Sequence, residues 1–279
     1  MPSTPSTPST PDGNRRITVP DFFKRKKKGA PLVVLTAYDR ATTLAAEAGG
    51  VDALLVGDSL ANVLLGYEST LPVTLDEMIH HGRAVGRARR RALMIVDMPW
   101  MSYHVTPEDA VRNAARIVRE TGADAVKLEG GRKRLPAVRA ILDAEIPVMG
   151  HLGLTPQSVL TMGGYRVQGK IDGSAERLLD DAATLAEAGV FSVVLEGIPG
   201  DLASRITEAV PIPTIGIGAG DGCDGQVLVY HDLLGMLPED SPKFVRRYAE
   251  LYDTQVEAIR QWVTAVRDRT FPSDEETYH

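Results

Sequence analysis

Eight short runs of apolar and β-branched residues recur along this chain. They cover residues 31–38, 53–59, 92–99, 125–130, 147–153, 192–199, 213–220 and 225–232. Segments with helical spacing separate most of these runs. Near-continuous apolar strands that alternate with helices are typical of a parallel sheet that is buried on both faces. Eight such units within about 250 residues predict an α/β fold of the (β/α)8 TIM-barrel type.

Local sequence signals mark where several of the intervening helices begin and end. Thr74 and Glu77, in "TLDE", form a capping-box pattern ahead of a helical segment. Thr106 followed by Pro107 is a typical N-cap and first-turn pair for the next helix. Glycines that end helices are expected at Gly49, Gly122 and Gly189.

The connections between the runs separate the barrel from the open doubly wound sheet. An open sheet would carry a glycine-rich phosphate loop after its first strand, but "LTAYDR" follows here. Only "DGCDG" (221–225) and its neighbours separate strands seven and eight, so no regular helix is expected between them. We predict an extra N-terminal helix within residues 17–29, at the bottom of the barrel, and the eighth helix over residues 242–270.

Hydrophobic content and its distribution suggest how the chain is divided. The 279 residues are 43% hydrophobic, which is enough for one large core or two small ones. Residues 1–16 form a Pro/Ser/Thr-rich tail that lacks apolar residues after Met1, so we expect it to be disordered. Its repeated prolines also disfavour the amphipathic helix of a transit peptide. We predict one barrel domain over residues 17–272 and a short C-terminal tail over 273–279.

Charge and cysteine content exclude several classes of partner. The formal net charge is -6, which argues against a nucleic-acid-binding surface. No apolar stretch approaches the roughly 20 residues that a membrane span needs. A single cysteine, Cys223, excludes an internal disulfide and fits a reducing compartment. We therefore expect a cytoplasmic protein without nucleic-acid or membrane partners.

Acidic residues stand at or just beyond the ends of four predicted strands. Asp58, Asp97, Glu129 and Glu196 each share a strand face with an inward residue two positions earlier. The active sites of such barrels lie at the carboxyl ends of the strands. A single acid there can cap a helix or form a salt bridge. Three acids on consecutive strands repel one another unless a cation or protons neutralise them, and an all-oxygen set favours Mg²⁺ or a similar hard ion.

Two further residues are candidates for the same site. Lys127 shares a face with Glu129 and could form a Schiff base, a structural salt bridge or an ion pair with a substrate carboxylate. Beside an acidic cluster, the ion pair with a substrate is favoured. His151 ends strand five, where its ring either faces the pocket or is a satisfied core histidine.

Several long motifs closely resemble the ketopantoate hydroxymethyltransferase family. The resemblance runs in order from about Ile17 to Pro272, and only the Pro/Ser/Thr tail falls outside it. One local departure is Trp100, which stands where that family usually has phenylalanine. The motifs are "LTAYD", "LLVGDSLANV", "LPVTLDEM", "VKLEGG", "HLGLTPQS", "GGYRVQG" and "IPTIGIGAGDGCDGQVLV".

The resemblance implies a role for each of the candidate residues. Asp58, Asp97 and Glu129 match the acids that hold Mg²⁺ over the barrel mouth. Ser59 and Lys127 match contacts to the 2-oxo acid substrate, which also lies against the two aspartates through the metal. Glu196 matches the general base, and His151 remains a candidate pocket residue.

The resemblance also implies a reaction and an assembly. A hydroxymethyl group passes from 5,10-methylenetetrahydrofolate to 3-methyl-2-oxobutanoate through a Mg-stabilised enolate. The product is 2-dehydropantoate (ketopantoate), an intermediate in pantothenate and coenzyme A biosynthesis. Family members assemble as homodecamers of two stacked pentameric rings.

Two alternative functions remain open at the level of sequence. One is a Mg-dependent C–C lyase or mutase of the phosphoenolpyruvate/isocitrate-lyase-like barrels, which share an acid-lined mouth. Those enzymes generally carry a catalytic cysteine or phosphate contacts on a loop, whereas Cys223 lies far along this chain. The other is a barrel that binds 2-oxo acids as a sensor. Binding alone requires no base, so Glu196 disfavours a sensor.

Overall fold

The computed structural model describes residues 15–164, 167–169 and 173–279. Residues 1–14 of the predicted tail lie outside the described residues. The chain divides into two compact units at residues 227 and 228, and each is described by itself.

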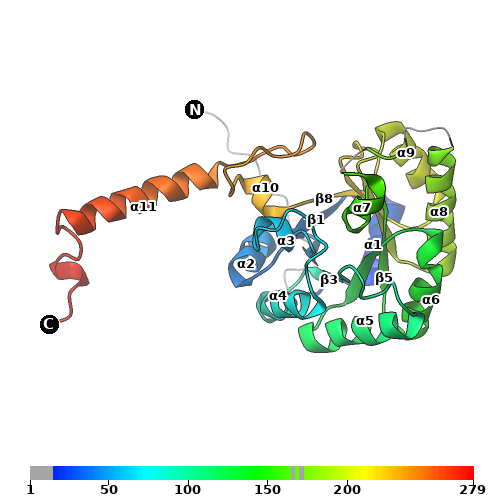
Figure 1. Cartoon of the computed structure of the whole chain (residues 1–279), viewed down its shortest axis with the longest axis horizontal. Helices are drawn as coiled ribbons and strands as arrows, with labels where there is room; N and C mark the ends of the chain where they lie inside the picture. The colour runs from blue at the N-terminus through cyan, green and yellow to red at the C-terminus, as the bar shows by residue number, and fades with distance from the viewer. Residues whose placement is uncertain (1–14, 165–166, 170–172) are drawn as a thin grey trace. The chain divides into compact units, whose positions relative to one another are not determined.

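The first unit contains a closed barrel of eight parallel strands in the order of the sequence, which confirms the predicted fold (Figure 1). Each of the eight predicted apolar runs contains one strand, and every strand is shorter than its run. The strands are β1 (Leu32–Thr36), β2 (Ala53–Val56), β3 (Leu93–Asp97), β4 (Ala125–Glu129), β5 (Val148–Gly153), β6 (Ser192–Glu196), β7 (Thr214–Ile217) and β8 (Gly225–Leu228).

Helices cover the outside of the barrel, and consecutive outer helices contact one another (Figure 1). The longer ones are α2 (Arg40–Gly49), α4 (Leu75–Ala88), α5 (Pro107–Thr121), α6 (Leu135–Asp143), α8 (Ser174–Ala188) and α9 (Gly200–Ala209). Short turns of helix occur after β2, β4 and β5: α3 (Leu60–Val63), η1 (Arg132–Arg134), η2 (Pro156–Ser158) and α7 (Val159–Met162).

The predicted helix ends are largely confirmed. The Thr74 side chain accepts a hydrogen bond from the Glu77 peptide N–H, and the Glu77 carboxylate closes the capping box. The Thr106 hydroxyl caps α5 by accepting a hydrogen bond from the Asp109 peptide N–H at 3.1 Å. Gly122 and Gly189 end their helices in the left-handed conformation. The prediction at Gly49 was one residue early: Gly50 has the left-handed φ of 86°, and Gly49 is still helical.

The predicted N-terminal helix is α1 (Val19–Lys28). Phe22 is fully buried in a cluster with inward-facing residues from the strands. Its ring meets that of Phe191, at the start of β6, edge to face with centroids 5.5 Å apart. α1 therefore contributes an aromatic side chain to the apolar core of the barrel.

The chain between β7 and β8 is short, as predicted. Residues 218–224, all described, form no helix. Strand eight ends earlier than expected, at Leu228, because Tyr230 already belongs to a helical turn.

The second unit contains α10 (Tyr230–Leu234), α11 (Leu251–Arg267) and η3 (Asp274–Glu276). The helix predicted over 242–270 is present only from Leu251. Residues 242–250 instead return to α10, where the Tyr248 peptide N–H donates to the Leu233 carbonyl at 2.8 Å. No helix in the described parts of the chain is both long and apolar enough to cross a membrane.

Candidate active site

The strand register brings charged residues together at one end of the barrel. Asp97 of β3 lies beside Lys127 of β4, and Glu129 of β4 lies beside His151 of β5. Glu196 ends β6 next to Gly153. Since all eight strands are parallel, these positions share the carboxyl-terminal mouth, where barrel enzymes place their chemistry.

Asp58 and Asp97 form the centre of a buried charged cluster. The Asp58 peptide N–H donates to Oδ2 of Asp97 at 3.1 Å. The Lys127 ammonium lies 3.1 Å from Oδ1 of Asp97. All three side chains are almost completely buried. The cluster thus holds acids and a compensating cation away from water.

Gln157 links this cluster to Glu129. Its side-chain amide donates to Oδ2 of Asp58 at 2.8 Å, and its peptide N–H donates to Oε2 of Glu129 at 2.9 Å. The Tyr103 hydroxyl donates to the Gln157 amide oxygen at 2.6 Å. It also accepts from the Glu129 peptide N–H at 3.1 Å. Gln157 and Tyr103 therefore fix two of the acids from the loops after β5 and β3.

Burial and repulsion between neighbouring carboxylates raise the pKa values of the two aspartates in the cluster. Burial, followed by the charges of Asp97 and Glu129, raises the pKa of Asp58 well above its usual range. Burial also raises the pKa of Asp97, although Lys127 opposes this. Burial opposes protonation of Lys127, but Asp97, Glu129 and Asp58 outweigh it and raise the Lys127 pKa. The lysine remains a cation, and a further cation would relieve the acids.

His151 lies between two glutamates. Its Nδ1 is 3.5 Å from Oε1 of Glu129 and 3.3 Å from the Lys127 ammonium. Its Nε2 is 3.1 Å from Oε2 of Glu196. Burial and the Lys127 charge oppose protonation, but the two carboxylates outweigh them and raise the pKa of His151 to about 9. The ring is therefore a cation at neutral pH, held against Glu196.

Ser59 stands directly after Asp58, at the start of α3. Its hydroxyl shares a hydrogen bond of 2.9 Å with the Tyr38 hydroxyl. A Cβ at Gly57 would come within 2.9 Å of the Ser59 oxygen and 3.6 Å of Oδ2 of Asp97. A side chain at position 57 would therefore displace the Ser59 hydroxyl, whereas its distance from Asp97 would be an ordinary contact.

The donor set fits a hard divalent cation held by few protein ligands. Within the described parts of the chain, no three acidic, histidine or cysteine side chains are gathered tightly enough to bind a metal ion by themselves. Oδ1 of Asp97 and Oε1 of Glu129 are buried and accept no well-aligned hydrogen bond. Mg²⁺ commonly takes one or two carboxylates and completes its shell with water and substrate oxygens. Carboxylate oxygens with unused acceptor capacity suit that mode of binding.

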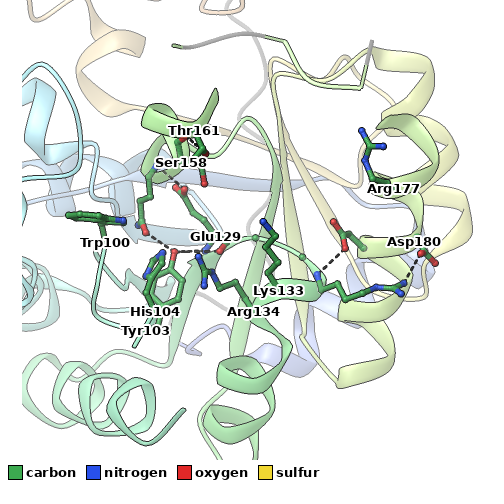
Figure 2. Close-up of a pocket in the computed structure, with 15 residues that line it drawn as sticks. Trp100, Tyr103, His104, Glu129, Lys133, Arg134, Ser158, Thr161, Arg177 and Asp180 are labelled. Carbon is green, nitrogen blue, oxygen red and sulfur yellow. Dashed lines mark hydrogen bonds and ion pairs between the residues drawn. The ribbon is translucent and has the colours of Figure 1, made fainter. Parts of the chain in front are cut away.

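A cavity of about 580 Å³ adjoins the cluster on the side of Glu129. Its walls include Trp100, Tyr103 and His104, and the cationic residues that follow β4 (Figure 2). Glu129 therefore borders both the buried cluster and an accessible space.

The structure brings together all seven residues singled out from the sequence: Asp58, Ser59, Asp97, Lys127, Glu129, His151 and Glu196. Sequence reasoning did not single out Gln157 or Tyr103. Gln157 lies within the "HLGLTPQS" motif, which was the only signal available, because both residues act through contacts with distant strands.

Comparison with known proteins identifies the family. Residues 16–274 match the family model described as ketopantoate hydroxymethyltransferase. A "3-methyl-2-oxobutanoate hydroxymethyltransferase" of Moorella thermoacetica is 54% identical over 263 residues, which cover 94% of this chain and 98% of that relative. One of the same name from Trichlorobacter lovleyi is 55% identical over 264 residues, covering 95% and 99%.

Solved structures with low identity show the same fold. Phosphonopyruvate hydrolase in complex with oxalate and Mg²⁺ is 12% identical, with a TM-score of 0.60 and coverage of 93% of each chain. A 2,3-dimethylmalate lyase of the PEP mutase/isocitrate lyase superfamily is 15% identical, with a TM-score of 0.58 and coverage of 93% and 91%. The family match and the close relatives span nearly the whole chain, and the chain therefore belongs to the ketopantoate hydroxymethyltransferase family of enzymes.

Proposed function

We propose that this protein transfers a hydroxymethyl group from 5,10-methylenetetrahydrofolate to 3-methyl-2-oxobutanoate. The products are 2-dehydropantoate and tetrahydrofolate, and one water is consumed to supply the new hydroxyl group. The observation that carries this proposal is the pairing, in one barrel mouth, of a buried acid cluster with a separate glutamate that contacts His151 at 3.1 Å. The first suits a chelating 2-oxo acid, and the second suits proton removal.

Glu196 is the proposed general base. The C3 proton of the substrate is weakly acidic because it lies next to the ketone. Contact with the His151 cation holds the Glu196 carboxylate in place, 3.1 Å from Nε2. Water breaks both bonds from the methylene carbon to the folate nitrogens and releases the one-carbon unit as formaldehyde and the folate as tetrahydrofolate. Removal of the proton leaves a nucleophilic C3, which bonds to the formaldehyde carbon, and the carbonyl oxygen takes up a proton to become the new hydroxyl. A positioned base contributes roughly 10²–10⁴-fold to such a step.

Lys127 and Ser59 are the proposed contacts to the substrate. The ammonium of Lys127 is buried and remains charged, so it can balance a substrate carboxylate where water is excluded. The Ser59 hydroxyl is directed by its hydrogen bond with Tyr38 and can donate or accept at the substrate. Both residues would orient the 2-oxo acid so that C3 faces Glu196.

Asp58 and Asp97 are the proposed direct ligands of Mg²⁺, with Glu129 reaching the ion through water. When bound, a divalent ion polarises the ketone of the 2-oxo acid and so increases the acidity at C3. Gln157 would hold Asp58 and Glu129 in position for it, through the two hydrogen bonds described above.

A direct assay tests this function. The purified protein is incubated with Mg²⁺, 3-methyl-2-oxobutanoate and 5,10-methylenetetrahydrofolate, and products are followed by mass spectrometry. Ketopantoate should form in proportion to tetrahydrofolate and should require both substrates. Cleavage of 2,3-dimethylmalate or phosphonopyruvate without ketopantoate formation would instead support the lyase or mutase alternative. A cytoplasmic location and a homodecameric assembly are proposed on family resemblance and need separate measurement.

A further inference from the structure

The cavity beside Glu129 contains features that proton removal and metal binding do not use. Its inner wall carries Glu129 and the aromatic side chains of Trp100 and Tyr103. Lys133 and Arg177 line the same space (Figure 2). The cavity therefore has an aromatic part and a cationic part, and Glu129 of the buried cluster lies between them in Figure 2.

The positive charge is only partly neutralised. Arg132 forms an ion pair with Asp180 at 2.6 Å, and its peptide N–H donates to Asp181 at 2.9 Å. These contacts engage both aspartates of the cavity wall. Lys133 and Arg177 form no ion pair within the described residues, and both are exposed.

Arg134 adds to the positive potential near the aromatic wall. Its guanidinium lies over the Tyr103 ring, 5.8 Å from the centroid. Burial, followed by the Arg134 charge, lowers the pKa of His104 to about 4. His104 is thus neutral at neutral pH, and the cavity has an uncharged aromatic part and a cationic part.

We propose that this cavity binds the p-aminobenzoyl-glutamate end of the folate co-substrate. The aromatic ring would pack against the exposed indole of Trp100, and the glutamate carboxylates would pair with Lys133 and Arg177. The reactive methylene has to lie near the acid cluster, so the tail extends away from Glu129 toward the cations. This inference rests on the proposed function.

Two kinds of ligand could supply several negative charges here: the carboxylates of a folate tail, or phosphate groups of another metabolite. The exposed indole of Trp100 in the same cavity as Glu129 favours the folate tail, because a phosphate group gains nothing from an aromatic surface. The experiment separates these sources by using each one as a competitor.

The test compares 5,10-methylene donors that carry no glutamate, one glutamate and three glutamates. For the wild-type protein, the donor KM should fall as glutamates are added. In Lys133→Ala/Arg177→Ala, the KM of the triglutamate donor should rise roughly 5- to 50-fold and its dependence on glutamate number should disappear. The KM of the 2-oxo acid should be the same in the double variant as in the wild type. Arg139→Ala is the matched control, since it removes an exposed cation of α6 that does not line the cavity.

Competition identifies the ligand chemistry. p-Aminobenzoyl-triglutamate should compete with the donor, and more weakly in the double variant. A donor KM that is independent of glutamate number in the wild type, or charge-dependent competition by inorganic pyrophosphate alone, would overturn the proposal.

Failure of the function would look different from failure of this inference. If the wild type formed no ketopantoate, the proposed function would fail, and calorimetry with p-aminobenzoyl-triglutamate would still test the cavity. Binding lost in the double variant but kept in Arg139→Ala would support the cavity assignment, and no binding to the wild type would contradict it. Lys133→Gln and Arg177→Gln provide single variants with smaller changes in shape.

Discussion

The ends of β4 and β6 carry the same Leu-Glu-Gly sequence, yet their glutamates have different surroundings. The backbones share two features. Gly130 and Gly197 both have positive φ, 112° and 56°. Each glycine N–H donates to the next strand, to His151 and Ile217 respectively, at 2.9 Å. The shared Leu-Glu-Gly sequence therefore ends both strands with a glycine of positive φ that bonds to the neighbouring strand.

The side chains differ because their neighbours differ. Glu129 is 3% exposed and accepts a hydrogen bond from the Gln157 peptide, next to the cluster with Lys127. Glu196 is 16% exposed and contacts the His151 ring. Lys127 lies two residues before Glu129, whereas the apolar Val194 lies two residues before Glu196. Only β4 therefore has a lysine on the same face as its glutamate. Adjacent strands and loops, rather than the shared motif, therefore distinguish the surroundings of the proposed metal-site carboxylate, Glu129, from those of the proposed base, Glu196.

The largest effect on turnover is expected at Glu196. Glu196→Gln keeps the side-chain volume but cannot accept the proton, so kcat should fall roughly 10²–10⁴-fold. Mg²⁺ affinity, measured by calorimetry, should stay at the wild-type value. Glu187→Gln, an exposed change at the end of α8, is the control and should leave kcat unchanged. Loss of Mg²⁺ binding in Glu196→Gln would place this residue with the metal ligands instead.

The next largest effect is expected on stability, at Lys127. Lys127→Met removes the cation among three buried acids, and breaking such a cluster costs about 3 kcal/mol. Urea unfolding measures this loss, and Lys133→Met, an exposed change, should cost far less. Added Mg²⁺ should restore part of the stability, because a bound cation stabilises the folded state. A loss below about 1 kcal/mol would mean that the acids are neutral by protonation.

Substitutions of Asp97 on β3 and Glu129 on β4 should reduce Mg²⁺ affinity by different amounts. Asp97→Asn removes a proposed direct ligand and should weaken Mg²⁺ binding roughly 100-fold, whereas Glu129→Gln should weaken it roughly 10-fold, as expected for an outer contact. Asp58→Asn should resemble Asp97→Asn. Calorimetry of the three variants gives the ranking, and equal affinities for all three would remove the distinction between direct and water-mediated ligands.

The smallest effect concerns His104, beside the β4 end. Its pKa is lowered from 6.5 to about 4 in the folded state. The unfolded chain therefore binds a proton that the folded chain does not, and stability from this residue is lost as pH falls from 6.5 toward 4. Half-burial limits the effect to about 1 kcal/mol. His104→Gln should reduce the difference in unfolding free energy between pH 6.5 and 4.5, and an unchanged difference would contradict the assignment.

The strand positions and the location of the acids at the barrel mouth could be predicted because both follow from the spacing of apolar residues along the chain. Apolar runs located all eight strands, and period-two spacing placed Asp97, Glu129 and Glu196 at the mouth. The contacts of Gln157 and Tyr103 could not be predicted, since each depends on loops from separate strands meeting in space. The start of α11 was predicted too early because the peptide N–H groups of Tyr248 and Tyr252 donate to Leu233 and Gly235 in the α10 region, a pairing that helical spacing does not reveal.

Hydrogen exchange at C3 of 3-methyl-2-oxobutanoate most directly tests whether the two glutamates have different roles. NMR in D₂O, with Mg²⁺ and without folate, follows exchange in the wild type, Glu129→Gln and Glu196→Gln. We predict that the wild type exchanges this hydrogen, that Glu129→Gln recovers exchange as Mg²⁺ is raised, and that Glu196→Gln stays roughly 10²–10⁴-fold slower at every Mg²⁺ concentration. Wild-type exchange in Glu196→Gln, or recovery of both variants with Mg²⁺, would contradict the account.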